Sequence, residues 1–439
     1  MSSSAALRSF EALWRARTPD PLATLRGEAM RRVVADGLPT TRDESWRYTN
    51  LRMLSAQSFD DAPAPAADAA ARVLSLSSLA GAGCAPSIAI VNGYPVLGDR
   101  QNQEGFADGS MEITNLRTLA ARDAEALMRR FAASADSDRR RWALLNTALF
   151  IDGLHVKIKG AAAPLLIVHM SEAGRPNTAA HSRVIIDLEP GASATIIEHH
   201  IAGGEHGVLC NSAAEIALAP GAAIEHYRVF ATMNSTTHFD TLDVRMAKDS
   251  RCREYTIAIG GGLVRATLEA HLDEPGAALD SQTLLAGTDA RHVDCVNTAI
   301  HAARMTTSRQ TARAIAGGTS RVIFNSKVIV NEGAAGADSR QSSRGLLLAP
   351  TAEIDTRPQL QIHADEVKCA HGATVGRLDP DMLFYLLSRG LDRATAQSLL
   401  VFAFLDDVLT GMSSAPARHA IETALIALLP DAELLRAFR

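Results

Sequence analysis

The spacing of hydrophobic and polar positions divides the chain into three regions. The first, residues 1–150, is mainly helical. Apolar residues in the segment 7–14 recur at intervals of three and four, the spacing of one buried helix face, and the segment 118–134 is composed of strong helix formers. An Ala/Pro-rich linker at 61–71 and a β-like run at 87–96 with an Asn-Gly turn interrupt the pattern. We predict an N-terminal helical domain with a linker over residues 1–150.

In the second region, from about residue 151 to 365, helical periodicity fades and short β-rich runs follow one another. Examples are PLLIVHM, SRVIIDLE, ATIIEHHIA and SRVIFNSKVIV, each bounded by Gly, Pro, Asn or Asp. Alanine and threonine alternate with larger side chains, as expected where one face of a strand is buried. We predict a mainly β core over residues 151–376.

This β region contains a weak internal repeat of one turn followed by one strand. The copies are LEPGASATI from Leu188, LAPGAAIEH from Leu218, DEPGAALDS from Asp273, LAPTAEIDT from Leu348 and, more loosely, NEGAAGADS from Asn331. Proline fixes φ and glycine permits positive φ, so such a segment can make a tight corner. Repeated corners indicate a sheet wound into a coil whose rungs hydrogen-bond to one another. A β-sandwich also has recurring turns, and the pattern alone leaves both folds open.

The third region, residues 377–439, has clear helix signals. Asp379 can cap a helix that has Pro380 in its first turn and ends at Gly390. Further helices follow, and apolar residues within 399–409 form a stripe that faces either the core or a partner. We predict a C-terminal helical domain over residues 377–439.

Composition and charge exclude several classes of function. The chain has 439 residues, of which 47% are hydrophobic and 21% charged, an ordinary globular composition. The net charge of −5 gives no basic excess for nucleic acid, and no polybasic run suits an anionic membrane. The apolar run at 399–405 is far shorter than the roughly 20 residues that span a bilayer. Acidic residues interrupt the Ser- and Arg-rich start, unlike a transit peptide.

The cysteines and histidines give few specific signals. Five cysteines are scattered without a CxxC pair, which fits a reducing compartment, and we expect a cytoplasmic protein. They are Cys84, Cys210, Cys252, Cys295 and Cys369. Two clusters invite a metal hypothesis but lack zinc-ligand spacing, so we interpret both as structural, the first as exposed strand and loop histidines. These clusters are His199, His200 and His206, and His292, Cys295 and His301. No P-loop and no GxSxG nucleophile motif occurs.

Cys369 and His371 lie in the segment EVKCAHGATVG and are the strongest candidates for chemistry. Residues two apart in an extended segment point to the same face. An imidazole beside a thiol can lower the pKa of the thiol and raise its nucleophilicity and metal affinity. A single CxH pair is weak evidence of a functional site, however. From these residues alone, the pair could be catalytic, bind a metal or belong to a structural turn.

The segment 356–409 resembles the C-terminal signature of the SufB/SufD family of iron–sulfur cluster assembly proteins. It contains PQLQI, ADEVKCAHGAT and LFYLLSRG. The resemblance extends over most of the chain, through DESWRYTNLRML from Asp43 and LLNTALFIDGLHVKI from Leu144. It implies a mainly β fold with a right-handed parallel β-helix core between N-terminal and C-terminal helical domains, and so favours the coil over the sandwich.

Several features favour the SufD branch of this family over the SufB branch. SufB-type members carry an essential cysteine just before the LLL run, whereas this chain has SRQSSRGLLLAP, with Ser342 and Ser343 and no thiol. SufB-type members also typically lack the KCxHGAT form. The chain length and the WRYT start agree with the SufD branch.

The resemblance implies a non-catalytic scaffold. SufD pairs with SufB, and we expect this contact to be made through the β-helix edges. Each of the two binds one copy of the ATPase SufC, and we expect that contact to be made through the C-terminal helices. The complex builds a nascent iron–sulfur cluster with sulfur from a cysteine desulfurase system. Reduced FAD is associated with such complexes and is expected outside this chain alone. We therefore expect no firmly held cofactor here, a transient iron–sulfur cluster at the SufB–SufD interface, and ATP hydrolysis in SufC.

The same resemblance changes the interpretation of the CxH pair. His371 matches a histidine that the family uses at the SufB–SufD interface, so it becomes a candidate ligand or proton site for the nascent cluster, with Cys369 as a less certain partner. Two alternatives are a homodimeric β-helix scaffold without SufB and a carbohydrate-active β-helix enzyme. The second requires aromatic platforms for sugars, and residues 151–365 contain no tryptophan.

Overall fold

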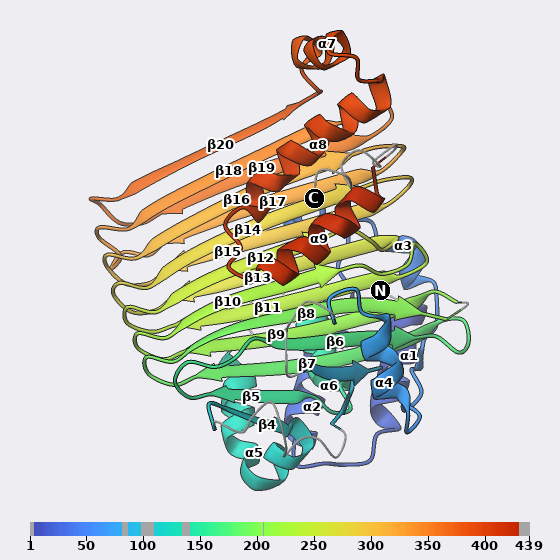
Figure 1. The fold of residues 1–439 in the computed structure, drawn as a ribbon. Helices are drawn as coiled ribbons and strands as arrows, with labels where there is room; N and C mark the ends of the chain where they lie inside the picture. The colour runs from blue at the N-terminus through green and yellow to red at the C-terminus, as the bar shows by residue number, and fades with distance from the viewer. Residues whose placement is uncertain (1–3, 81–86, 98–108, 134–140, 205, 430–439) are drawn as a thin grey trace.

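The computed structural model describes residues 4–80, 87–97, 109–133, 141–204 and 206–429, and a parallel β-helix forms its centre (Figure 1). Within the coil, the odd-numbered strands from β5 to β19 form sheet A and the even-numbered strands from β6 to β20 form sheet B. Successive strands alternate between the two sheets, so each turn of the chain adds one strand to each sheet. The expected fold class is confirmed: a coil rather than a sandwich, with helices at both ends.

The coil strands lie in parallel register with their neighbours from β5 onward. Their bounds are β5 (Leu154–Ile158), β6 (Leu165–Glu172), β7 (Thr178–Leu188), β8 (Ser193–Gly203), β9 (Val208–Leu218), β10 (Ala223–Phe230), β11 (Thr237–Met246), β12 (Arg251–Ala258), β13 (Leu263–Leu272), β14 (Ala278–Gly287), β15 (His292–His301), β16 (Thr307–Ala316), β17 (Arg321–Val330), β18 (Asp338–Leu347), β19 (Glu353–Ile362) and β20 (Lys368–Gly376).

The predicted Pro-Gly corners stack on one another along the coil. Gly191 and Gly221 adopt φ values of 71° and 70°, which glycine reaches without steric cost. The Gly191 N–H donates to the carbonyl of Pro220 in the next corner at 3.0 Å, and the Gly221 N–H donates to the carbonyl of Lys248 at 2.8 Å. The repeat in the sequence therefore encodes both the corner and its hydrogen bond to the next turn.

The interior of the coil is apolar at its two sides and polar between them. Strand β10 illustrates the arrangement, because alternate residues point inward. Ile224 belongs to one apolar cluster and Phe230 to another, whereas His226 and Arg228 lie between them, fully buried. Similar polar positions recur on neighbouring strands, and we call these inward polar residues the polar strip.

The N-terminal region covers the outer face of sheet A and caps the first turn of the coil (Figure 1). Trp142 stacks on Phe239 of sheet A with 3.8 Å between ring centroids. The predicted β-like run forms a hairpin whose Asn92 and Gly93 have φ of 53° and 85°. The elements are α1 (Ala5–Arg15), α2 (Ala23–Asp36), η1 (Glu44–Trp46), α3 (Arg52–Ser55), β1 (Asp60–Asp61), α4 (Ala69–Leu76), β2 (Ser87–Val91), β3 (Tyr94–Val96), β4 (Met111–Asn115), α5 (Leu116–Ala133) and α6 (Arg141–Leu149).

The C-terminal helices are α7 (Pro380–Ser388), α8 (Arg393–Leu409) and α9 (Ala415–Ala427). The predicted cap is confirmed, because the Asp379 carboxylate accepts from the Asp381 N–H at 2.8 Å. The stripe of α8 faces the core: Leu405 and Leu409 are buried with α9 against the outer face of sheet B. Helix α7 instead projects beyond the last turn (Figure 1). No helix within the described ranges is long and apolar enough to cross a membrane.

Candidate functional site

Cys369 and His371 both lie on β20, the last strand of sheet B (Figure 1). β20 pairs with β18 on one side, where Cys369 is in register with Ser339 and His371 with Gln341. Its other edge has no neighbouring strand among the described residues, and the same holds for β19 at the end of sheet A. Both sheets of the coil therefore end at one turn, which we call the last rung.

The CxH pair lies on one face of β20, as the two-residue spacing predicts, and that face is the inside of the coil. Cys369 is half-buried and packs against one of the two interior apolar clusters. Partial burial, followed by the negative charge of Asp338, raises the pKa of the Cys369 thiol. His371 continues the inward row but is exposed, because no further turn covers it. The geometry therefore places an accessible imidazole and a protonated thiol at the open end of the coil.

An amide ladder of the polar strip ends directly below His371. Gln310, Gln341 and His371 are in register on three successive strands of sheet B. The Gln341 side-chain N–H donates to Gln310 Oε1 at 3.2 Å. Gln341 Oε1 is buried and has no hydrogen-bond partner among the described residues. An acceptor without a donor is therefore held on the rung next to the imidazole.

Large apolar side chains are exposed around this end of the molecule. Ile362 on β19 and Val375 on β20 are 42% and 41% exposed. On α7, Met382, Phe384 and Tyr385 are 56%, 71% and 56% exposed. Exposed apolar groups that lie together, as the adjacent Phe384 and Tyr385 do on α7, are typical of protein interaction surfaces. The last rung and α7 together therefore have the character of surfaces that another protein covers.

The first histidine cluster of the sequence is not arranged as predicted. His199 and His200 point to opposite faces of β8, as expected for adjacent residues, but both are buried rather than exposed. The expectation of exposed strand histidines was wrong because both faces of β8 are covered. His199 Nδ1 lies 2.8 Å from Ser77 Oγ outside the coil, and His200 stacks on Phe230 inside it. His206 lies apart, beside a surface hollow.

The second cluster is dispersed, because its members have separate partners. His292 contacts Thr49 Oγ1 at 2.9 Å, and His301 contacts Thr306 and Ser308, each at 2.8 Å. Cys295 is buried, as are Cys210 and Cys252, and burial raises the pKa of all three thiols. Cys84 lies outside the described residues.

Sequence reasoning missed a buried histidine–glutamate group in the polar strip. Glu198 accepts from His169 Nε2 at 2.8 Å through one oxygen and from His226 Nε2 at 2.8 Å through the other. Burial acts to raise the pKa of Glu198, but these two hydrogen bonds outweigh it and hold that pKa well below its ordinary value. The sequence does show polar residues in the middle of the β-rich runs. That these residues meet in one cluster can be seen only once the register of the strands is known.

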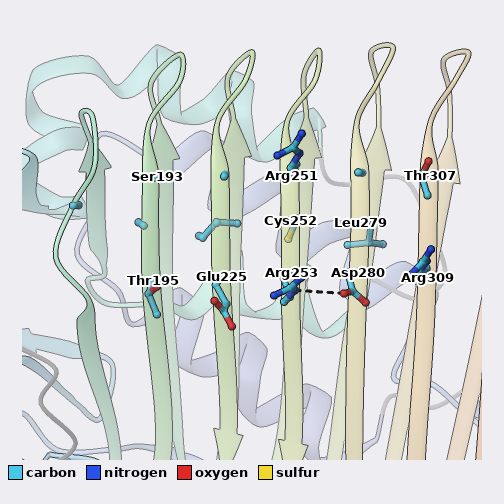
Figure 2. Close-up of a pocket in the computed structure, with 15 residues that line it drawn as sticks. Ser193, Thr195, Glu225, Arg251, Cys252, Arg253, Leu279, Asp280, Thr307 and Arg309 are labelled. Atoms are coloured by element: carbon cyan, nitrogen blue, oxygen red, sulfur yellow. Dashed lines mark ion pairs between the residues drawn. The ribbon is translucent and has the colours of Figure 1, made fainter. Parts of the chain in front are cut away.

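An open groove lies on the outer face of sheet B (Figure 2), and its lining residues come from β8 to β16 and the segment before β6 rather than from the last rung. Its volume is about 530 Å³, and small outward residues such as Ser193 leave room for it. Arg253 pairs with Asp280 at 3.4 Å across its floor. The groove contains neither member of the CxH pair, so it is a separate feature of the surface.

The fold and the site define a class of protein: a parallel β-helix with helical ends and an open last rung that carries an inward-facing CxH pair. The chain belongs to the SufBD family: the model for "SUF system FeS cluster assembly, SufBD core domain" matches residues 169–404, and the model for the SufBD N-terminal region matches residues 7–162. The chain is thus a SufBD-family component of the SUF iron–sulfur cluster assembly system.

Curated relatives agree with the SufD branch. The chain is 29% identical to the iron-sulfur cluster assembly protein SufD of Escherichia coli, over 90% of this chain and 89% of that protein. It is 28% identical to a SufBD family protein of Synechocystis, over 85% and 83% of the two chains. It is 24% identical to SufD of Bacillus subtilis, over 69% and 70%. The resemblance to SufD inferred from the sequence is confirmed.

Proposed function

We propose that this chain is a scaffold subunit that pairs with SufB through its last rung and binds the ATPase SufC through its C-terminal helices. The observation that carries the proposal is the open last rung, where two unpaired strands, exposed apolar side chains and an accessible imidazole occur together. An unpaired strand edge is a template for pairing with another chain. A similar coil placed end to end would bury this rung and enclose His371 between the two subunits.

His371 serves in this proposal as a ligand or proton site for the nascent cluster, which is the cargo of the complex. Adjacent strands lie about 4.8 Å apart, so the unpartnered Gln341 Oε1 is within reach of an N–H from the His371 ring. That hydrogen bond would fix the tautomer and leave the other ring nitrogen free to face the partner. Neutral imidazole is a good ligand for iron.

Cys369 has a smaller role in the same proposal. Its partial burial and raised thiol pKa favour the protonated form, which is a poor metal ligand. Cys369 therefore packs the rim of the coil and becomes a ligand only if a bound metal displaces its proton. Exchanging it for serine should affect the cluster less than removal of His371.

The surface for SufC is α7 rather than the stripe of α8. The α8 stripe is already buried on sheet B, whereas Phe384 and Tyr385 on α7 are exposed. Because α7 follows β20 directly, a force on α7 would act on the last rung. This arrangement gives an ATPase a short mechanical connection to the proposed cluster site.

The test is co-expression with SufB and SufC, followed by purification and measurement of iron and acid-labile sulfide. His371→Ala should leave the complex assembled but deplete the cluster. His363→Ala is the matched control, because His363 is also an exposed histidine near this rung and its ring contacts the Gln361 side chain at 2.8 Å. Retention of a full cluster by His371→Ala would refute the site. A wild-type chain that forms homodimers and captures no SufB would refute the pairing.

A further inference from the structure

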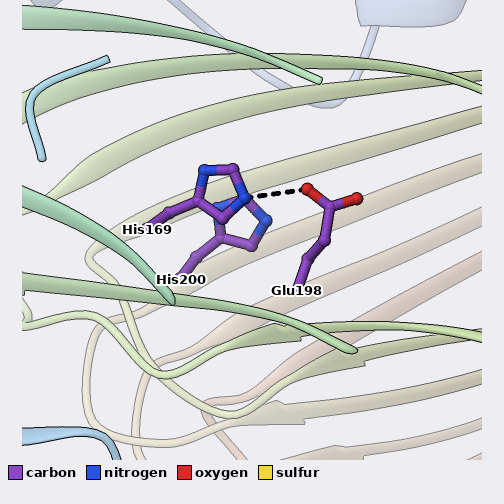
Figure 3. Close-up of side chains that lie close together, drawn as sticks. All are labelled: His169, Glu198 and His200. Carbon is purple, nitrogen blue, oxygen red and sulfur yellow. Dashed lines mark hydrogen bonds and ion pairs between the residues drawn. The ribbon is translucent and has the colours of Figure 1, made fainter. Parts of the chain in front are cut away.

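A group of potential metal ligands is enclosed in the first turns of the coil (Figure 3). It consists of His169 on β6 and Glu198 and His200 on β8, all fully buried. One ligand atom from each of the three lies within 4.8 Å of the others. The rings of His169 and His200 stack with 4.3 Å between centroids. The three side chains thus converge on one small volume inside the protein.

Several nitrogens at this place lack hydrogen-bond partners among the described residues. They are His200 Nε2, His169 Nδ1 and His238 Nδ1, and all are buried. Buried polar atoms are normally paired, and an unpaired one costs roughly 1–3 kcal/mol. Unpaired nitrogens therefore surround the place where the three side chains converge, and among them His200 Nε2 is available to bind a ligand there.

A cavity lies next to these nitrogens. Its volume is about 10 Å³, and its lining includes His169, His200, His238 and Cys210. That is space for about one water molecule or one ion. The lining therefore offers imidazole and thiol groups, and the adjoining Glu198 offers a carboxylate.

We propose that His169, Glu198 and His200 bind one divalent first-row transition-metal ion, such as Fe²⁺ or Zn²⁺, inside the β-helix. Two imidazoles and one carboxylate form the donor set that such ions favour, whereas Ca²⁺ and Mg²⁺ prefer oxygen alone. Ligands about 2.1 Å from one ion can be at most about 4.2 Å apart, so small side-chain adjustments would complete the site. Glu198 would exchange its hydrogen bond with His169 for a bond to the ion and keep the one with His226.

This site is separate from the proposed cluster site. Six strand spacings separate β8 from β20 in sheet B, and at about 4.8 Å each this is roughly 29 Å. The metal proposal therefore does not depend on pairing with SufB or on His371. An ion here would stabilise the first turns of the coil, because it binds the folded chain and not the unfolded one.

A second group of potential ligands, Asp243, Glu269 and His271, must be controlled for. It lies on the outer side of sheet A and is partly accessible, and its members already form ion pairs. We therefore place the experiment in a His271→Ala background, in which this surface group is incomplete.

The experiment uses the full chain, expressed in medium supplemented with iron or zinc and, separately, refolded with Fe²⁺, Zn²⁺ or Co²⁺ under anaerobic conditions. Metal content after desalting should be about one ion per chain, and Co²⁺ should give ligand-field bands of a nitrogen/oxygen site. His200→Phe removes a ligand while its ring can still stack on Phe230, and it should weaken metal binding at least about 100-fold. His199→Phe is the matched control on the opposite face of the same strand, and it should retain the ion.

Thermal unfolding of each variant shows which chains are folded, and Glu198→Gln supplies a second ligand variant if one histidine variant is not. Retention of the ion by both His200→Phe and Glu198→Gln would overturn the proposal. So would a background chain that takes up no ion by either route, since the cavity would then hold only water. Loss of all metal on the His271→Ala change alone would assign the ion to the outer surface instead.

Discussion

Replacing Arg228 with methionine removes a positive charge from the centre of the polar strip. The Arg228 guanidinium is fully buried and contacts two carboxylates, Asp240 at 2.5 Å and Glu254 at 3.0 Å. It also donates to Thr256 Oγ1 at 2.7 Å. Methionine is unbranched and uncharged, so the change keeps an apolar side chain in this space but removes the positive charge together with its hydrogen bonds. Both carboxylates would then remain inside the coil without their cation.

The expected loss of stability is large because a buried charge without its partner is costly. Removing one member of a buried ion pair typically destabilises a protein by about 3–5 kcal/mol, and we expect Arg228→Met to lose at least that much near pH 7. Burial raises the pKa of Asp240, and the Arg228 charge opposes that rise. In the variant this pKa rises further above its unfolded value. The destabilisation is therefore greatest well above the raised pKa and shrinks as the pH falls through it, because the carboxylate is then neutral.

Equilibrium urea unfolding followed by far-ultraviolet circular dichroism measures this loss. Arg253→Met is the control: Arg253 lies on the outer face of sheet B and pairs with Asp280 at 3.4 Å while partly exposed, so its loss should be about 0–1 kcal/mol. The triple change Arg228→Met, Asp240→Asn and Glu254→Gln should recover most of the stability. If Arg228→Met equals the control, or if its deficit grows as the pH is lowered, the reasoning is wrong.

Two further predictions concern pH and α7. Burial lowers the pKa of His301 to about 4. Between that pH and about 6.5 the unfolded chain therefore takes up a proton that the folded chain does not, and stability falls as the pH is lowered. His301→Asn should remove about 1.4 kcal/mol per pH unit from this slope, and equal slopes for the two proteins would contradict the prediction. On α7, the double change Phe384→Ser and Tyr385→Ser alters two exposed side chains, so it should change the free energy of unfolding of the free chain by less than about 1 kcal/mol. The same double variant should fail to capture SufC in a pull-down. Undiminished capture would exclude α7 as the docking surface.

The local signals in the sequence predict the elements well, because they act over a few residues. Asp379 caps α7 through its own carboxylate, and the Gly191 and Gly221 corners adopt the positive φ that their sequence suggests. The choice between coil and sandwich depends on which strand pairs with which, and short β runs do not encode this register. The resemblance to a family supplied that information, and the pairing of every second strand confirms it.

The candidate site was only partly predictable for the same reason. The two-residue spacing correctly placed Cys369 and His371 on one face, since that depends on one strand. The meeting of His169 with Glu198 and His226 depends on the register of three strands. The alternation of side chains along a strand also showed that His199 and His200 point to opposite faces of β8. It did not show that helices and loops cover one of these faces and that the coil encloses the other. Burial on both faces is a tertiary property, and period-two patterns do not report it.

The two edges of the last rung differ in a way that bears on how a partner would approach. β19 contains Pro358, which has no N–H to offer a neighbouring strand, and its Arg357 is tied to Glu44 of the N-terminal region at 2.5 Å. β20 contains no proline, so every residue keeps its backbone N–H, and Lys368 is its only lysine, arginine or acidic residue. Natural edges usually carry charges or proline where pairing is harmful. β20 lacks this protection, so strand addition by a partner is favoured there, and it would bring the partner chain to about 4.8 Å from the strand that carries His371.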